Sequence, residues 1–104
     1  MIQVLLINPN TKTVSYVDIA DTKEALQELI GFTSIDSDEI DDNGDRLFFD
    51  EDCFIRQQAN IGRFKIDSLA PVAGIGVIVN NKDGKTYQSA AVDLEALVKR
   101  VSFL

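Results

Sequence analysis

Carboxylates are the residues in this sequence whose types and spacing could do chemistry. Nine of the seventeen acidic residues lie within residues 36–52, where Arg46 is the single base, and the rest of the chain carries eight acids and nine bases. The formal net charge of −7 therefore belongs mainly to one segment. Its acids are Asp36, Asp38, Glu39, Asp41, Asp42, Asp45, Asp50, Glu51 and Asp52. A cluster of this density attracts a basic protein surface or a cation.

Part of the acidic segment follows the pattern of a calcium-binding loop. The residues at the ligand and glycine positions of such a loop would be Glu39, Asp41, Asn43, Gly44, Asp45 and Asp50. The fit is incomplete, because the first position is a glutamate, Arg46 stands where an apolar residue is usual, and the last position is an aspartate, one carbon too short for easy bidentate binding. A hairpin turn with solvated carboxylates is the alternative, and we expect no bound metal.

Asp50 and Asp52 suggest a second chemistry, acid and base catalysis. If they end a strand, their side chains share one face and could act as a proton-transferring pair or hold a magnesium ion. The chain has no histidine to assist them. Clustered acids are more typical of a solvated edge, so we expect no catalytic residues and a protein that is not an enzyme.

Cys53 is the single cysteine, so it cannot form an internal disulfide. A nucleophilic thiol needs a neighbouring base to lower its pKa, and histidine is absent. Because Cys53 stands among apolar residues, it is predicted to be a small core residue in a reducing, cytoplasmic protein.

Gly74 and Gly76 do not complete a dinucleotide-binding fingerprint, because the third glycine and a capped helix are missing. They predict a bulge or the close packing of a helix, and no cofactor is expected.

Three bases follow the acidic segment and alternate with apolar residues: Arg56, Arg63 and Lys65. They are too few to argue for nucleic-acid binding by a chain with a net charge of −7. They could pair with the preceding acids, or line a crevice that binds an anionic small molecule.

The elements that carry these residues follow from length and patterning. With 104 residues, 45% of them apolar, the chain can close one core, so residues 1–104 are predicted to form a single globular domain. Residues 2–7 and 13–19 are β-rich and are joined by Asn8-Pro9-Asn10, which favours a turn. They predict an opening hairpin whose first strand, apolar on both faces, is central in its sheet and covered on both sides.

Two short helices are expected. Asp21 and Glu24 have the spacing of a capping box with Asp21 as the N-cap, and Gly31 follows where a left-handed C-cap belongs. A second helix begins after Asp93, and its apolar residues at i, i+3, i+4 and i+7 carry it to Val101.

Two further hairpin turns are predicted between the helices. Asn43-Gly44 is the dipeptide typical of a tight type I′ turn. Residues 80–85 lie between a buried strand at residues 73–79 and a short strand at residues 86–88. The sum is an α+β domain with a mostly antiparallel sheet of about five to seven strands and two short helices packed on it.

The apolar start of the chain predicts neither a membrane span nor a targeting signal. Residues 2–7 are too few to cross a bilayer, no basic region precedes them, and no small-residue cleavage site follows. We expect a cytoplasmic protein with no membrane association.

Three blocks of the sequence support a resemblance that covers nearly the full length. They are MIQVLLINP at residues 1–9, GDRLFFDE at residues 44–51 and PVAGIGVIV at residues 71–79, followed by an Asp-Gly turn and a short terminal helix. With these blocks the chain resembles small uncharacterised proteins of bacteriophages, prophages and plasmids. The resemblance implies a fold more than an activity, and it offers no catalytic residues. Its implied setting is that of a small accessory protein of a mobile element in a bacterial cytoplasm.

The leading hypothesis is a non-enzymatic protein whose nine clustered acids bind a basic protein of host or phage origin, as an inhibitor or a nucleic-acid mimic. The alternative is a module that binds a small molecule, a nucleotide or a divalent cation, with Arg56, Arg63 and Lys65 as its candidate ligand-binding residues. No direct binding to nucleic acid is expected. The acids could also serve only to protect a hairpin edge from aggregation. A homodimer through an edge strand or through the terminal Phe103-Leu104 is a further possibility.

Overall fold

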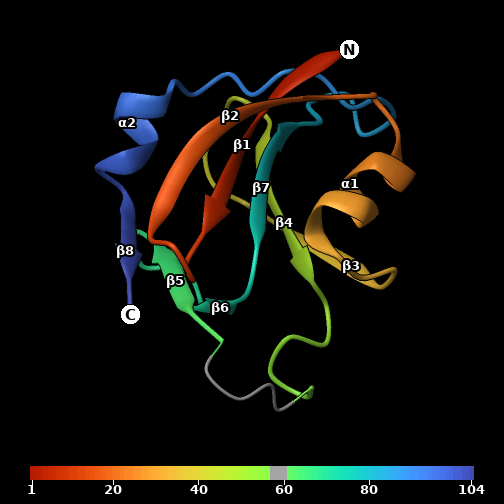
Figure 1. Ribbon diagram of the computed structural model, residues 1–104. Helices are drawn as coiled ribbons and strands as arrows, with labels where there is room; N and C mark the ends of the chain where they lie inside the picture. The colour runs from red at the N-terminus through yellow and green to blue at the C-terminus, as the bar shows by residue number, and fades with distance from the viewer. Residues whose placement is uncertain (57–60) are drawn as a thin grey trace.

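The computed structural model describes residues 1–56 and 61–104, which form eight strands and two short helices (Figure 1). In chain order the elements are β1 (Ile2–Asn8), β2 (Thr13–Ile19), α1 (Lys23–Ile30), β3 (Ile35–Glu39), β4 (Asp45–Asp50), β5 (Arg63–Ile66), β6 (Val72–Ala73), β7 (Gly76–Asn80), α2 (Leu94–Val98) and β8 (Val101–Phe103). The strands form two antiparallel sheets, of five and three strands, so the α+β prediction is confirmed with one strand more than its upper estimate. No helix in the described ranges is long and apolar enough to cross a membrane.

The larger sheet has the strand order β2-β1-β7-β4-β3. Its first two strands form the predicted opening hairpin, which pairs Ile2 with Ile19 at one end and Asn8 with Thr13 at the other. β1 also pairs with β7, so the central position expected from its apolar residues is confirmed. The acidic hairpin β3–β4 lies at the edge opposite β2.

Two hydrophobic cores lie on the two faces of this sheet. α1 covers one face, where Leu26 packs with Val4. The smaller sheet and α2 cover the other face, where Phe64 and Leu97 pack with Leu5. Figure 1 shows these layers, with α1 on one side of the five strands and β5, β8 and α2 on the other. Both faces of β1 are buried because successive side chains of a strand point to opposite sides.

The prediction of one continuous strand at residues 73–79 was wrong, because the chain passes from one sheet to the other within this segment. It leaves β6 at Ala73, turns through Gly74 at a φ of +89°, and enters β7 at Gly76 in the larger sheet. A β-carbon on Gly76 would lie 2.8 Å from Leu47 Cδ1 and would also clash with Phe64 Cζ. Glycine therefore permits the close packing predicted here, although it is packing between two sheets and not against a helix.

The start of α1 differs from the prediction by one residue. Thr22, and not Asp21, is the N-cap, because its Oγ1 accepts a hydrogen bond from the N–H of Ala25 at 3.2 Å. With this N-cap, Glu24 stands one position too early for a capping box, so the predicted box was wrong. The left-handed C-cap predicted at Gly31 is confirmed by its φ of 93°.

The second helix is shorter than its apolar spacing predicted. Asp93 is the N-cap, as expected, but α2 ends at Val98 and does not reach Val101. Residues Val101–Phe103 form β8, which pairs with β5 and brings Phe103 opposite Phe64. A helix as short as α2 gains little stability from its own hydrogen bonds. Residues 101–103 therefore adopt the strand conformation, in which they pair with β5 and cover the core.

The β3–β4 loop spans residues 40–44 and is not the tight type I′ turn predicted from Asn43-Gly44. Gly44 has a φ of +92°, but Asn43 does not have the positive φ that this turn also requires. Ile40 is buried, and the Asn80 side chain donates a hydrogen bond to the Asn43 carbonyl oxygen at 2.8 Å, so tertiary contacts shape the loop. The second predicted hairpin is reduced to one bridge between Asn80 and Gln88.

Candidate interaction surface

The structure divides the nine acids of the predicted binding surface into three groups. Asp45 and Asp50, at the two ends of β4, are buried with 0% and 3% of their surface exposed. Asp41 and Asp52 lie 3.6 and 3.9 Å from a guanidinium nitrogen. The other five, which make no ion pair within the described residues, are Asp36, Asp38, Glu39, Asp42 and Glu51. Only part of the acidic segment is therefore presented to solvent without a partner.

Asp45 is an internal anchor. Its carboxylate accepts hydrogen bonds from the backbone N–H groups of Ala91 and Val92, both at 2.8 Å. The side-chain nitrogen of Asn80 donates a third bond at 3.1 Å. Because these donors occupy the carboxylate inside the protein, Asp45 holds the segment before α2 against β4 and is not presented to a partner.

Asp50 is paired with Arg56 through two hydrogen bonds. Arg56 Nε lies 2.6 Å from Asp50 Oδ2, and Nη2 lies 3.1 Å from Oδ1. The guanidinium also lies over the ring of Phe32, 3.9 Å from its centroid. The hydrogen bond with Asp50, together with the charges of Asp50 and Asp52, raises the pKa of Arg56 against an opposing effect of desolvation. Arg56 thus joins the end of β4 to the segment after α1.

Arg100 ties the tip of the acidic hairpin to the end of α2. Its Nη2 donates hydrogen bonds to the carbonyl oxygen of Ile40 at 2.6 Å and to Asp67 Oδ2 at 2.8 Å. Its Nη1 lies 3.6 Å from Asp41 Oδ2. The hydrogen bond with Asp67, followed by the charges of Asp67 and Asp41, raises the pKa of Arg100. Asp41 is therefore partly compensated within the chain.

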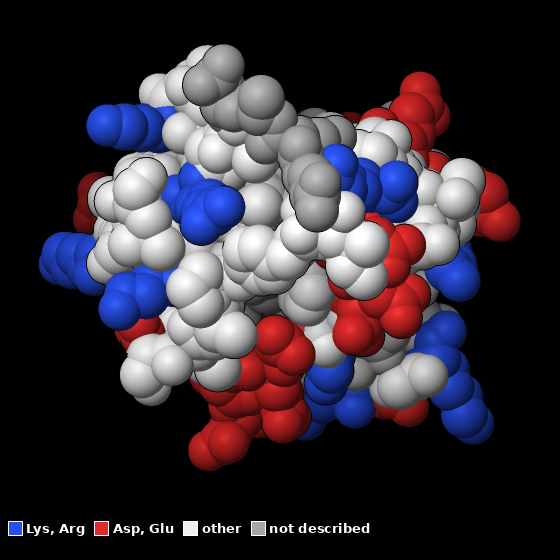
Figure 2. Space-filling view, turned by 90° about the horizontal axis from the view of Figure 1, so that it is seen from below, with Lys and Arg blue, Asp and Glu red and all other residues white. Residues whose placement is uncertain are grey.

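Four of these five carboxylates lie along β3 and its loop, and we call Asp36, Asp38, Glu39 and Asp42 the acidic edge. β3 is an edge strand of the larger sheet, and successive side chains point to its two sides. In the view of Figure 2, acidic side chains form separate groups with basic and uncharged side chains between them. The surface charge is thus less continuous than the sequence suggests. Within the acidic edge, Asp36, Glu39 and Asp42 are exposed and Asp38 is half-buried.

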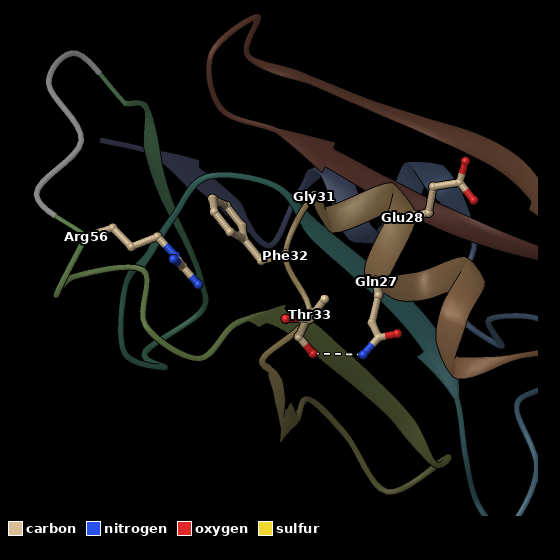
Figure 3. Close-up of a pocket in the computed structure, with 6 residues that line it drawn as sticks. All are labelled: Gln27, Glu28, Gly31, Phe32, Thr33 and Arg56. Atoms are coloured by element: carbon tan, nitrogen blue, oxygen red, sulfur yellow. Dashed lines mark hydrogen bonds between the residues drawn. The ribbon is translucent and has the colours of Figure 1, made fainter.

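A cavity of about 540 Å³ lies between the end of α1 and Arg56 (Figure 3). Its lining residues are Gln27, Glu28, Gly31, Phe32, Thr33 and Arg56. The Gln27 side chain donates a hydrogen bond to the Thr33 carbonyl oxygen at 2.8 Å. Its described lining carries one base, Arg56, which is paired with Asp50, and one exposed acid, Glu28.

The three bases predicted to bind a ligand are not gathered in one place. Arg56 lines the cavity near Phe32, whereas Arg63 and Lys65 lie on β5 and are not among the described residues that line it. The Arg63 guanidinium lies 5.7 Å from the ring centroid of Phe54. Of the three bases, Arg56 is thus the one found among the described residues that line this cavity.

The described residues contain no group of three or more acidic, cysteine or histidine side chains placed to hold a metal ion. The calcium-loop pattern is divided, because Asp45 and Asp50 stand at opposite ends of β4 and each binds donors of the protein. Asp50 and Asp52 also do not form a free carboxylate pair, since Arg56 holds Asp50.

The predicted core position of Cys53 is confirmed, because its thiol is buried within the core. The next two residues were missed: Phe54 and Ile55 are 54% and 76% exposed, although the sequence grouped them with the core around Cys53. The signal that could have shown their exposure is the flanking charge, with Asp52 before them and Arg56 after them.

Asp83 anchors the turn after β7 and gives a pH prediction. Its carboxylate accepts hydrogen bonds from the N–H groups of Thr86 and Lys85 and from the Thr86 hydroxyl. These bonds lower the pKa of Asp83 below its ordinary value of 3.8, and the bond from the Thr86 N–H contributes most to the shift. A carboxylate with a lower pKa in the folded state stabilises the fold above its unfolded pKa, and this stabilisation is lost as the pH falls through the folded pKa.

We therefore expect Asp83→Asn to lower the midpoint of urea unfolding at neutral pH, and the difference from wild type to shrink below about pH 4. Asp42→Asn is the control, because Asp42 is exposed and accepts no hydrogen bond within the described residues. The same pH dependence for both variants would contradict the anchoring role of Asp83.

Comparison with known proteins finds no match. No family model, no curated protein and no solved structure matches this chain. The resemblance to phage, prophage and plasmid proteins stays an expectation, and the geometry of the surface carries the functional conclusion.

Proposed function

We propose that this protein is a non-enzymatic binding protein of a phage or other mobile element, and that its acidic edge contacts a basic surface of a host or phage protein. The observation that carries the proposal is the row of four carboxylates on β3 and its loop, without ion pairs among the described residues, beside acids that are bonded internally. Unpaired like charges repel one another and lower stability, so their concentration on one edge favours a role outside the fold.

Apolar side chains near the acidic edge would hold such a partner. Phe54 and Ile55 are exposed and follow shortly after the last residue of β4, Asp50. Asp50 pairs with Ile35, the first residue of β3, so the two apolar side chains lie near the start of β3. Exposed apolar residues bordered by charge are typical of contact surfaces, where charges guide association and apolar residues supply affinity.

The test is affinity capture from bacterial lysate, with and without phage infection, using wild type and two variants. In the edge variant, Asp36, Glu39 and Asp42 become Asn, Gln and Asn. In the control variant, the exposed acids Asp21, Glu24 and Glu95 are neutralised in the same way. Both variants lose three negative charges, so only the position of the lost charge differs.

We expect wild type and the control variant to retain the same partner, and the edge variant to retain roughly tenfold less of it. The complex should weaken steadily as the salt concentration rises from about 0.05 to about 0.5 M. Circular dichroism and unfolding midpoints establish that all three proteins fold. Equal capture by the three proteins, or a complex insensitive to salt, would contradict the proposal and leave the acidic edge as protection against aggregation.

A further inference from the structure

The two edges of the five-stranded sheet differ in their protection against pairing with another chain. β3 has three charged residues in its five positions, whereas β2 has Asp18 as its single charged residue in seven. The outer strands of the smaller sheet, β6 and β8, have only two and three residues. Short or charged edge strands resist pairing. Within the described ranges, β2 is therefore the long and weakly charged edge.

The hydrogen bonds of β1 show which groups of β2 face outward. Gln3 donates its N–H to the side chain of residue 89, and its carbonyl oxygen accepts a bond from residue 90, so both groups point away from β2. Gln3 lies opposite Asp18, so the two form a non-hydrogen-bonded pair of the antiparallel ladder. In such a pair the main-chain N–H and C=O groups of the two residues point away from each other. The main-chain groups of Asp18 therefore face outward, as do those of Tyr16 and Val14 at the same two-residue period. No described residue forms a backbone hydrogen bond with them.

We propose that β2 pairs in antiparallel fashion with β2 of a second copy of this chain, which joins two five-stranded sheets edge to edge. Outward-facing residues must stand opposite outward-facing residues for the main-chain groups to bond. The register that uses all of them places Tyr16 opposite its own copy on a two-fold axis, and Val14 opposite Asp18. A shift by two residues would leave one outward-facing residue of each strand without its partner, so this register is favoured.

The densest charge of the molecule lies away from this pairing. The acidic edge lies at the far side of the sheet, with β1, β7 and β4 between it and β2. In the favoured register each Asp18 stands opposite Val14 of the other copy, so the two aspartates are not direct neighbours. A second copy satisfies the outward-facing main-chain groups of both strands symmetrically.

Side chains around β2 also suit a symmetric interface. Tyr16 is 43% exposed, although its hydroxyl accepts a hydrogen bond from the N–H of Leu94 at 2.9 Å. Its ring would lie beside its own copy across the axis, an arrangement in which aromatic rings stabilise a strand pair. A hollow beside the end of β2 is lined largely by apolar residues: Ile19, Ala20, Ala25, Glu28 and Leu29. The second copy would cover part of this apolar surface, which adds to the main-chain bonds.

The test is sedimentation equilibrium of the full chain from about 1 to about 500 µM, a range in which a small interface gives partial association. Wild type is expected to pass from monomer to dimer. Asp18→Pro removes an outward-facing N–H without removing a bond to β1, and should weaken the dimer roughly tenfold or more. Asp18→Ala keeps that N–H and is the matched control, which should associate like wild type.

Hydrogen exchange locates the interface. With rising concentration, the amides of Val14, Tyr16 and Asp18 should exchange more slowly, whereas those of β3 and β8 should not change. A chain that stays monomeric at the highest concentration, a dimer that Asp18→Pro does not weaken, or protection that appears in β8 instead of β2, would each overturn the inference. Capture of a basic partner by the acidic edge is measured separately, so either proposal can fail without the other.

Discussion

Replacing Asp45 with alanine is expected to lower the free energy of unfolding by about 3 kcal/mol, or roughly 15 °C in Tm. The reason is that three donors lose their acceptor inside the protein: the N–H groups of Ala91 and Val92 and the side-chain nitrogen of Asn80. A buried donor left without a partner costs roughly 1–3 kcal/mol, and partial access of water reduces the sum. Urea unfolding followed by circular dichroism measures the loss.

Asp42→Ala is the matched control for Asp45. Asp42 lies in the adjacent loop, is exposed, and accepts no hydrogen bond within the described residues, so its replacement should change stability by less than about 0.5 kcal/mol. Asp45→Asn keeps the size of the side chain but turns an NH₂ group toward backbone donors, and should give an intermediate loss. A loss under about 1 kcal/mol for Asp45→Ala would contradict its role as an anchor.

This prediction also bears on how binding should be tested. A variant in which the whole acidic segment is neutralised would lose the internal bonds of Asp45 and Asp50 together with the exposed charge. Such a variant could lose capture through its weakened fold, whatever the acidic edge does. Changes limited to Asp36, Glu39 and Asp42 separate the two effects, since these side chains are exposed.

Gly76→Ala is expected to lower the free energy of unfolding by about 2–3 kcal/mol. The added β-carbon would lie 2.8 Å from Leu47 Cδ1 and would clash with the ring of Phe64, and both side chains are buried between the two sheets. The core cannot absorb the methyl group without moving one sheet relative to the other, because protein interiors are close-packed. Urea unfolding again measures the loss.

A second substitution tests whether Phe64 causes this clash. Phe64→Leu removes the end of the ring, and alone it should cost about 1–2 kcal/mol through the void that it leaves. In the double variant the methyl group of Gly76→Ala fills part of this void, so the total loss should fall short of the sum by about 1 kcal/mol. Leu26→Ala, in the other core, is the control and should add to Gly76→Ala without coupling. Strict additivity with Phe64→Leu would show that the clash lies elsewhere.

Features that depend on a few neighbouring residues could be predicted well. The β1–β2 hairpin, the C-cap at Gly31 and the N-cap at Asp93 follow from strand propensity, the freedom of glycine and a short side-chain bond. Predictions failed where distant segments decide a local conformation. Pairing with β5 converts the end of the predicted second helix into β8, and the change of sheets at Gly74 divides one predicted strand into two.

The sequence by itself determined the α+β class, the buried position of Cys53 and the crowding of acids into one hairpin, because alternation, composition and charge can be read along the chain. Only the tertiary structure decided which of those acids face solvent. A carboxylate is free or bound according to the donors that surround it, and the donors of Asp45 stand at residues 91 and 92, far along the chain. The tertiary structure likewise decided that β2 is an edge strand. A strand is at the edge when it has a neighbouring strand on one side only, and this depends on the order of the strands in the sheet.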